Sequence, residues 1–581
     1  MTAAGPAIAD PVPRDAPGAL EIGFSLPDRY NAGAILFDNL AAGRGAKVAV
    51  TGPAGARSYA GLCADACRFG SALLGLGLKP SERVLLFLDD TPTYPAAVFG
   101  ALRAGLVPLL INTLTPPDLL QFYLADSGAR LAVTDAGFAD RFTATACAGT
   151  GLETILVSNG GAPSGLGAPA RSADALLAQA SPRLDAADTR RDSMAFWMYS
   201  SGSTGRPKGV VHLHHDMAYT AASYARHVLR LREDDICFSV PKVFFAYGFG
   251  NSLTFPFSVG ASSVLSPGQP KAGAVFDAVA RFKPTVFFGL PTLYTALTKA
   301  PEAKGADLSS LRLCVSAAEV LAAEVVGEWR SMSGLEIVEG LGSTEALHIY
   351  LSNAPDAMRP GAAGRRVPGY ELALKDPDGR EVGDGEEGVL DIRGDSTAPC
   401  YWNRPDKTAH AMREDGWLHT GDRFVRDADG FYFFRGRADE LVKVAGQWVY
   451  PLEVELCLAD HPAVRECAVL AVELPDRRTT LQAFVVANEP GHDAHATART
   501  LQDHVKRALL PHKYPRIVTF MDDLPKTGTG KIDRQALLRG PVRGVAAERE
   551  TASVDPRALS AAQTRGSARL EGGPQIRPDA E

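Results

Sequence analysis

Hydrophobic stretches with helical spacing alternate with short β-branched runs along the first part of the chain. Tyr59–Leu78 and Thr93–Ala104 have the apolar spacing of helices, and strand-like runs follow them at Arg83–Leu88 and Val107–Ile111. This alternation is typical of strands joined by crossover helices, so it predicts a mostly parallel sheet wrapped by helices. The same order returns in a helix at Phe276–Phe282, strands at Thr285–Gly289 and Leu311–Ser316, and a helix at Ala322–Met332.

The pattern changes between Val367 and Glu440, where short strand-like runs are separated by turns. These turns combine Asp with Pro or Gly, as in Asp376–Gly379, Asp384–Gly385 and Asp427–Gly430. Turns of this composition join neighbouring antiparallel strands rather than crossovers. We therefore expect an α/β region of parallel-rich sheets that ends in a small antiparallel β element.

A compact segment of about a hundred residues follows and has the size of a second domain. Its pattern predicts a small α+β domain with strands near Leu441–Val444, Ala463–Val472, Leu481–Val486 and Arg516–Phe520, and helices at Pro451–Leu458 and Leu501–Leu510. Both ends of the chain are expected to be disordered, because one is rich in Ala and Pro and the other lacks aromatic side chains. The predicted limits are a tail at 1–20, a large domain at 21–438, a small mobile domain at 439–539 and a second tail at 540–581.

The composition excludes several classes of protein. With 46% hydrophobic and 22% charged residues among 581, the chain has the composition of a large globular protein. Its formal net charge of −7 argues against nucleic acid or an anionic membrane as a partner and favours a small molecule. The N-terminus lacks a signal-peptide pattern, and Arg103 interrupts the apolar segment Tyr94–Asn112 before it reaches membrane-spanning length. These features predict a cytoplasmic protein, with a homodimer as one option for its oligomeric state.

The segment Tyr199–Gly209 has the composition of a phosphate-binding loop. Its glycines let the backbone approach an anion, its serines and threonine supply hydroxyl donors, and Arg206 and Lys208 add positive charge. It differs from the P-loop of common NTPases, because Pro207 precedes Lys208 and a strand-like run follows where that loop would open a helix. From these residue types alone, a mobile surface hairpin is the alternative.

With this loop, the chain resembles the adenylate-forming enzymes, which include acyl- and aryl-CoA synthetases, luciferases and the adenylation domains of nonribosomal peptide synthesis. The resemblance covers roughly residues 25–540. Further segments follow the loop in the family's order, namely Leu341–Glu345, Trp417–Asp422, Gly436–Glu440 and Pro525–Lys531. A chance match to one loop would not bring the other segments with it.

The resemblance implies residues that bind ATP and act on it. The loop would hold the β- and γ-phosphates, Glu345 would bind Mg²⁺, and Thr344 would contact the α-phosphate. Asp422 and Arg437 would bind the ribose hydroxyls, and Lys531 would bridge the acid and the α-phosphate in the transition state. Thr344, Glu345 and Lys531 are thus the implied catalytic residues. The implied ATP- or AMP-binding residues are Ser200, Ser201, Gly202, Ser203, Thr204, Gly205, Lys208, Glu319, Asp422 and Arg437.

The aromatic run Val243–Asn251, together with Leu347–Tyr350, resembles the benzoate-CoA ligase branch of this family. A slot of Phe, Ala and Tyr suits a flat aromatic acid, although such a run is also common in a protein core. His348 is either a satisfied core histidine or a hydrogen-bond donor to a ring substituent. The implied acid-binding residues are Phe245, Ala246, Tyr247, Ala318, Gly342 and His348.

Two positions depart from the branch. Ala318 stands where the branch has Gly and narrows the pocket, whereas Ala346 replaces a larger side chain and opens it. Unsubstituted benzoate is therefore in doubt, and hydroxy-, amino- and halobenzoates stay open. Gly446 and Trp448 would line the path of CoA, and Asp439 stands at the family's hinge.

These features predict an ATP-dependent aromatic carboxylate-CoA ligase that uses ATP, Mg²⁺ and CoA. A small aromatic carboxylic acid would form an acyl-adenylate and pyrophosphate, and CoA would then displace AMP. Loading of a carrier protein is the alternative within the family, and the lack of a fused carrier segment argues mildly against it. A nucleotide-binding protein without catalysis is disfavoured, because the four charged residues of the motifs are all present.

Overall fold

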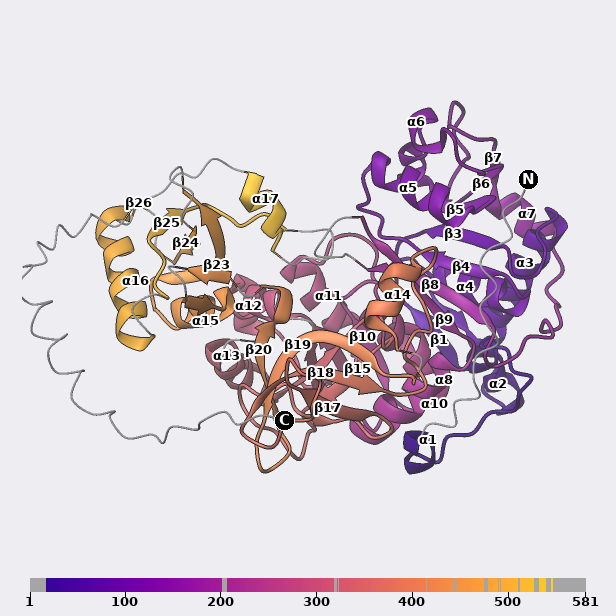
Figure 1. Cartoon of the computed structure of the whole chain (residues 1–581). Coiled ribbons are helices and arrows are strands. Elements are labelled where there is room, and N and C mark those ends of the chain that lie inside the picture. Colours follow the sequence, from indigo (N-terminus) through magenta and orange to yellow (C-terminus); the bar gives the residue numbers. More distant parts are fainter. Residues whose placement is uncertain are drawn as a thin grey trace, which may run out of the picture. The chain divides into compact units, whose positions relative to one another are not determined.

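The computed structural model of the protein divides into two compact units, which are described one at a time (Figure 1). The first contains residues up to Val442 together with Pro525–Asp533, and the second contains Lys443–Leu524 and the residues from Arg534 onward. The structure describes residues 17–200, 206–317, 321, 323–413, 415–440, 442–444, 447–474, 479–488, 491, 493–509, 513–526, 532–539 and 545–546.

Two large sheets form the centre of the first unit. Within the described residues, one sheet has seven strands, parallel except for the last pair, in the order β7 (Ala170–Ser172), β6 (Thr154–Ser158), β5 (Leu131–Asp135), β3 (Arg83–Phe87), β4 (Val107–Leu110), β8 (Met194–Ser200) and β9 (Lys208–Leu213). The other has nine, in the order β16 (Arg365–Arg366), β15 (Ile349–Ser352), β14 (Ile337–Gly342), β13 (Leu313–Ala317), β12 (Val286–Gly289), β10 (Ile236–Ser239), β11 (Ser262–Val264), β1 (Val48–Thr51) and β2 (Arg57–Ser58). The second sheet is parallel from β14 to β1 and antiparallel at both ends.

Helices connect the parallel strands. The longer ones are α2 (Ala34–Ala41), α3 (Tyr59–Gly75), α4 (Thr93–Arg103), α5 (Pro117–Ser127), α7 (Ala173–Gln179), α11 (Ala272–Phe282), α12 (Pro291–Lys299), α13 (Ala323–Ser333) and α14 (Pro405–Ala411). The shorter ones are α1 (Pro17–Glu21), η1 (Ala136–Arg141), α6 (Ala144–Cys147), α8 (Asp216–Thr220), η2 (Ala221–Val228), α9 (Ala246–Phe249), η3 (Gly250–Thr254), α10 (Phe255–Val259), η4 (Pro301–Gly305) and η5 (Ala438–Glu440). Segments η2 and η3 are π-helical, a geometry that is frequent at functional sites.

Local chemistry fixes where the helices start and how closely they pack. Helix α3 begins after Ser58, whose side chain accepts a hydrogen bond from the Gly61 amide. Helices α3 and α4 cross at Gly70 and Gly100, and a Cβ at Gly100 would lie 2.5 Å from the Ala66 carbonyl oxygen. The two backbones can therefore approach only because both positions lack side chains.

The predicted antiparallel element is confirmed as a four-stranded sheet in the first unit. Its strands are β17 (Glu371–Lys375), β18 (Glu387–Arg393), β19 (Leu418–Arg426) and β20 (Tyr432–Arg437), each paired with the next in sequence. The parallel-rich sheets and this element together confirm the predicted fold class for the large region.

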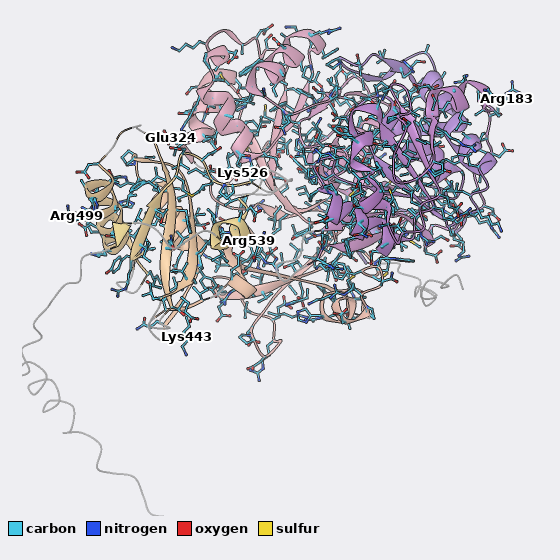
Figure 2. The ribbon with its side chains drawn as sticks, turned by 90° about the horizontal axis from the view of Figure 1, so that it is seen from above. Arg183, Glu324, Lys443, Arg499, Lys526 and Arg539 are labelled. Atoms are coloured by element: carbon cyan, nitrogen blue, oxygen red, sulfur yellow. The ribbon has the colours of Figure 1, made fainter. Side chains whose placement is uncertain are left out.

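The second unit is an α+β arrangement. It contains most of β21 (Val442–Val444), together with β22 (Gln447–Val449), α15 (Pro451–Ala459), β23 (Val464–Glu473), β24 (Thr479–Ala487), α16 (Ala494–Ala508), β25 (Ile517–Phe520), α17 (Arg534–Arg539) and β26 (Val545–Ala546). Strands β23 to β26 form one sheet in sequence order. Helix α16 buries Ala498, Leu501 and Val505, whereas Arg499 is exposed and points away from the sheet (Figure 2).

Short elements occur inside both predicted tails. Residues 17–20 belong to α1, where Glu21 forms an ion pair with Arg366 and accepts a hydrogen bond from the Gly369 amide. Val545–Ala546 pairs with β25. These residues of the predicted tails therefore belong to secondary-structure elements, and the rest of both predicted tails lies outside the described residues. None of the helices that the structure describes is long and apolar enough to cross a membrane.

Candidate active site

The predicted phosphate loop joins two antiparallel strands of the first unit. Ser200 at the end of β8 pairs with Lys208 at the start of β9, so the segment between them turns back at the edge of the seven-stranded sheet. Lys208 is the first residue of a strand, whereas the lysine of a common P-loop lies at the start of a helix. The structure therefore differs from a common P-loop, as the sequence predicts. Ser201, Gly202, Ser203, Thr204 and Gly205 lie outside the described residues.

Three polar side chains converge on Glu345, the predicted Mg²⁺ ligand. The Ser200 hydroxyl donates to Glu345 Oε1 at 3.2 Å, and the Tyr401 hydroxyl donates to the same oxygen at 2.9 Å. Lys208 Nζ lies 3.9 Å from that oxygen. Among the described residues all three contacts fall on Oε1, which leaves Oε2 as a hard oxygen donor suited to Mg²⁺.

Tyr401 is a site residue that the sequence prediction missed. It forms a β-bridge with Val210 of β9, and its ring centroid lies 4.0 Å from Lys208 Nζ. No local motif marks this tyrosine, because it reaches the site through pairing with a strand almost two hundred residues earlier in the chain. One side chain thus contacts both the lysine and the carboxylate.

Lys208 lies in a positively charged environment. Burial lowers the pKa of its ammonium group, and the nearby cations Lys407, Arg437 and Arg404 lower it further, while Glu345 opposes them. A partly buried cation among other cations is stabilised by a multiply charged anion. The site is therefore suited to the phosphates of ATP.

Asp422 and Arg437, the predicted ribose-binding pair, face each other across the antiparallel sheet. They occupy paired positions on β19 and β20, and Arg437 Nη1 donates to Asp422 Oδ1 at 3.1 Å. The same nitrogen donates to the Thr420 carbonyl at 3.3 Å. A fixed carboxylate beside a guanidinium can accept from and donate to a diol, as ribose binding requires.

The turn between β14 and β15 carries Thr344 and Glu345 in a constrained conformation. Leu347 has φ +64°, which is uncommon for a bulky residue, and it is buried. At Gly342 a Cβ would lie 2.3 Å from the His348 carbonyl oxygen, so the start of the turn admits no side chain. Strain of this kind is frequent at ligand sites and persists only where surrounding contacts hold it.

Tyr247 and His348, predicted to bind the acid, lie in one buried aromatic cluster. Their ring centroids are 5.5 Å apart, and the His348 ring also lies 4.4 Å from Phe255 and 5.3 Å from Tyr224. A Cβ at Gly250 would lie 2.4 Å from the His348 ring, so this glycine permits the contact. The cluster offers flat apolar walls of the kind that an aromatic ring packs against.

Phe245 and Ala246 contact a different hydrophobic cluster from Tyr247. Phe245 stacks edge-on against Phe244 with ring centroids 4.6 Å apart, and both Phe244 and Ala246 are buried. Tyr247 packs against the other cluster. Phe244 is therefore a residue of the hydrophobic core, and the role of Phe245 and Ala246 in acid binding stays a prediction.

The surroundings of His348 indicate which of its ring nitrogens carries the proton. Its Nε2 lies 3.4 Å from the Tyr247 carbonyl oxygen, which only accepts, so Nε2 carries the proton. Burial lowers the pKa of His348 to about 3, so the ring is neutral at neutral pH. Its Nδ1 has no hydrogen-bond partner among the described residues and is an acceptor. In this protonation state Nδ1 can only accept a hydrogen bond, and the role of His348 in acid binding stays a prediction.

Several predicted site residues cannot be placed. Ala318, Glu319, Gly446 and Lys531 lie outside the described residues. The backbone of Asp439 lies in η5 and that of Trp448 in β22, and their side chains are also outside the described part. Their assigned roles stay predictions.

Comparisons with known proteins show what the chain is similar to. Residues 37–402 match the model of the AMP-binding enzyme family, and residues 453–531 match that of the AMP-binding enzyme C-terminal domain. The chain is 43% identical to a benzoate–CoA ligase of Thauera aromatica, over 88% of this chain and 96% of that protein. It is 41% identical to a 4-hydroxybenzoate–CoA/benzoate–CoA ligase of Rhodopseudomonas palustris, over 91% and 97%. The structure of a benzoate CoA ligase from Burkholderia xenovorans LB400 is similar with a TM-score of 0.80 at 40% identity, covering 88% of this chain and 100% of that one.

Proposed function

The chain belongs to the AMP-binding enzyme family, and we propose that it is an ATP-dependent ligase that joins an aromatic carboxylic acid to CoA. A carboxylate oxygen of the acid attacks the α-phosphorus of ATP, the bond to the bridging oxygen breaks, and pyrophosphate leaves. The sulfur of CoA then attacks the carbonyl carbon of the acyl-adenylate, AMP leaves, and the thiol proton passes to solvent.

The described residues supply binding and charge for the first step. Two anions must meet, so their repulsion has to be offset before the carboxylate reaches phosphorus. Lys208 and the Ser200 hydroxyl lie where they can contact the phosphates, and Asp422 with Arg437 would fix the ribose. Mg²⁺, when bound at Glu345, adds positive charge at the phosphates. We retain the bridging role of Lys531 as part of the proposal.

The observation that carries the proposal is the meeting of Ser200, Lys208 and Glu345 from two different sheets. Strands β8 and β9 belong to the seven-stranded sheet, whereas Glu345 follows β14 of the nine-stranded sheet. A carboxylate held by a hydroxyl and an ammonium beside a glycine-rich turn suits a metal–triphosphate complex.

The acid is proposed to be a small, flat aromatic acid with a hydrogen-bond donor on its ring. Tyr247, Phe255 and His348 offer aromatic walls, and Nδ1 of His348 is an unpaired acceptor. A hydroxyl or amino group that reaches this nitrogen would satisfy a buried polar atom, whereas a fluorine would not. Relatives named for benzoate and 4-hydroxybenzoate support this class of acid.

A panel of acids assayed for pyrophosphate release, with and without CoA, tests the proposal. Benzoate, its hydroxy-, amino- and fluoro-derivatives and octanoate should be compared by kcat/KM. We expect the best benzoate to have a higher kcat/KM than octanoate. Each hydroxy- or aminobenzoate should also have a higher kcat/KM than the fluorobenzoate substituted at the same ring position. Comparable values for octanoate and the best benzoate would contradict an aromatic pocket. Pyrophosphate release without CoA-dependent thioester formation would favour the alternative, loading of a carrier protein.

Further parts of the proposal concern the whole protein. We propose a large domain at 21–438 and a small mobile domain at 439–539, with CoA passing Gly446 and Trp448 and the hinge at Asp439. The proposed location is the cytoplasm, and the proposed assembly is a homodimer. Light scattering on a size-exclusion column measures the assembly, and a monomer mass at all concentrations would contradict it.

A further inference from the structure

A buried histidine on β9 supports the turn that carries Thr344 and Glu345. His212 lies four residues after Lys208 and is fully buried. Its Nε2 is 2.8 Å from the Thr344 carbonyl oxygen, and its Nδ1 is 2.8 Å from Asp216 Oδ2. The ring stacks on Phe196 with centroids 5.3 Å apart, which fixes its plane. One strand therefore presents the phosphate-binding lysine and anchors the neighbouring turn.

Both hydrogen-bond partners of His212 are acceptors. A backbone carbonyl carries no proton, and Asp216 Oδ2 already accepts from the Leu213 amide at 3.0 Å. The Thr344 carbonyl therefore takes the hydrogen of Nε2, and a second hydrogen lies between Nδ1 and Asp216 Oδ2. The ring thus links the turn to Asp216, which is fully buried.

The adjacent histidines show that the partners set the protonation of each ring. His214 Nδ1 accepts a hydrogen bond from the Ala32 amide at 3.0 Å, and burial lowers the pKa of this ring to about 4, so it is neutral. His215 faces two carbonyl oxygens, those of Arg191 and Asp395, each at 2.8 Å. Its Nε2 also lies 3.3 Å from Asp216 Oδ1. Asp216 thus lies beside both His212 and His215.

We propose that His212 is a positioning residue for adenylation, a ring that ties the Thr344 carbonyl to Asp216 and so holds Glu345 beside Ser200 and Lys208. The inference rests on the proposed function. The turn needs such support because Leu347 has a left-handed φ, and its amide also donates a hydrogen bond to the Thr344 carbonyl, at 3.0 Å.

Two substitutions of His212 separate its two hydrogen bonds. The amide nitrogen of Gln matches the position of Nε2, so His212→Gln keeps a donor toward Thr344 and loses the donor toward Asp216. The amide nitrogen of Asn matches Nδ1, so His212→Asn keeps the donor toward Asp216 and cannot reach Thr344. We expect His212→Asn to lower the rate of pyrophosphate release by about 10- to 100-fold and to raise the Mg²⁺ concentration at half-maximal rate. His212→Gln should lose clearly less.

A third variant controls for packing in the same buried segment. His214→Asn alters a neighbouring ring that makes no contact with the turn, so it should lower the melting temperature and leave the Mg²⁺ requirement unchanged. Equal kinetic losses in His212→Asn and His212→Gln, with melting curves that show folded protein, would overturn the proposal. So would a Mg²⁺ requirement that shifts as far in His214→Asn as in His212→Asn.

The protonation of the ring can be measured without substrate. In protein labelled with ¹⁵N-histidine, Nε2 of His212 should give the signal of a nitrogen that carries a proton, identified by its loss in His212→Gln. His214 is the internal control and should show one protonated and one bare nitrogen. A bare Nε2 on His212 would overturn the proposal. This measurement is independent of the reaction, so failure of every aromatic acid as a substrate would count against the proposed function alone.

Discussion

Replacing Asp90 by Asn should stabilise the protein more at alkaline pH than in mild acid. Asp90 follows β3 and is 2% exposed, and burial raises the pKa of its carboxyl group to about 7. Its Oδ1 accepts a hydrogen bond from the Val243 amide at 3.1 Å, and Lys242 Nζ lies 4.0 Å from Oδ2. The carboxyl group therefore holds the start of the aromatic run that leads to Tyr247.

The sign and size of the change in the free energy of unfolding follow from the difference in the pKa of Asp90 between the folded and the unfolded state. Above its unfolded pKa of 3.8, an unfolded chain has lost the proton that the folded protein keeps up to about pH 7. The folded state binds more protons in this window, so the free energy of unfolding falls as the pH rises through it. One pH unit corresponds to about 1.4 kcal/mol, so the fall from about pH 5 to above pH 7 is about 3 kcal/mol. An Asn side chain keeps the acceptor for Val243 and has no charge to bury.

Chemical denaturation at about pH 5 and about pH 8 compares wild type with Asp90→Asn. We expect the stability advantage of the variant over wild type to be about 3 kcal/mol larger at about pH 8 than at about pH 5. Asp89→Asn is the matched control, because Asp89 Oδ1 binds Lys242 Nζ at 2.8 Å and its loss leaves a partly buried ammonium group without that partner. That variant should be less stable than wild type at alkaline pH. An identical pH dependence in wild type and Asp90→Asn would refute the reasoning.

Three further predictions concern the site. Glu345→Gln keeps an oxygen ligand but loses its charge, so adenylation at limiting Mg²⁺ should fall, and a wild-type rate there would contradict the metal assignment. Lys531→Ala should lower pyrophosphate release by about 10²- to 10³-fold and still convert supplied acyl-adenylate and CoA to thioester, whereas equal loss in both assays would argue against separate half-reactions. Because burial lowers the pKa of His348 to about 3, the unfolded chain gains a proton below about pH 6.5 that the folded chain does not. Stability should then fall by about 1.4 kcal/mol per pH unit toward pH 4, and His348→Gln should remove that slope.

The elements that the sequence predicts well are those whose ends are marked locally. Helix α3 was expected at Tyr59–Leu78 and ends at Gly75, because a Gly-Leu-Gly sequence stops the apolar spacing. Helix α16 starts at Ala494, seven residues before the predicted Leu501. Its first half has few apolar residues, but Asp493 caps it by accepting from the His495 and Ala496 amides. Capping chemistry could have located this start where hydrophobic spacing could not.

Side chains that reach the site from distant segments are beyond this kind of prediction. Tyr401 contacts Glu345 because its segment pairs with β9, and His212 contacts Thr344 because two sheets meet there. The local sequence around these residues predicts neither contact. The protonated nitrogen of His348 is likewise set by the Tyr247 carbonyl, which only the folded chain places beside it. Motifs thus predict which residues take part, and tertiary pairing decides how they are supported.

Glycines determine how closely the backbone approaches His348. A Cβ at Gly250 would meet its ring, and a Cβ at Gly342 would meet its carbonyl oxygen. Leu347, with its positive φ, lies directly before this position. Because Nε2 donates to the Tyr247 carbonyl, Nδ1 is the nitrogen left to accept a hydrogen bond from the proposed acid. If the acid packs against this cluster as proposed, selection among substituted benzoates should depend on the hydrogen that a substituent can offer at Nδ1.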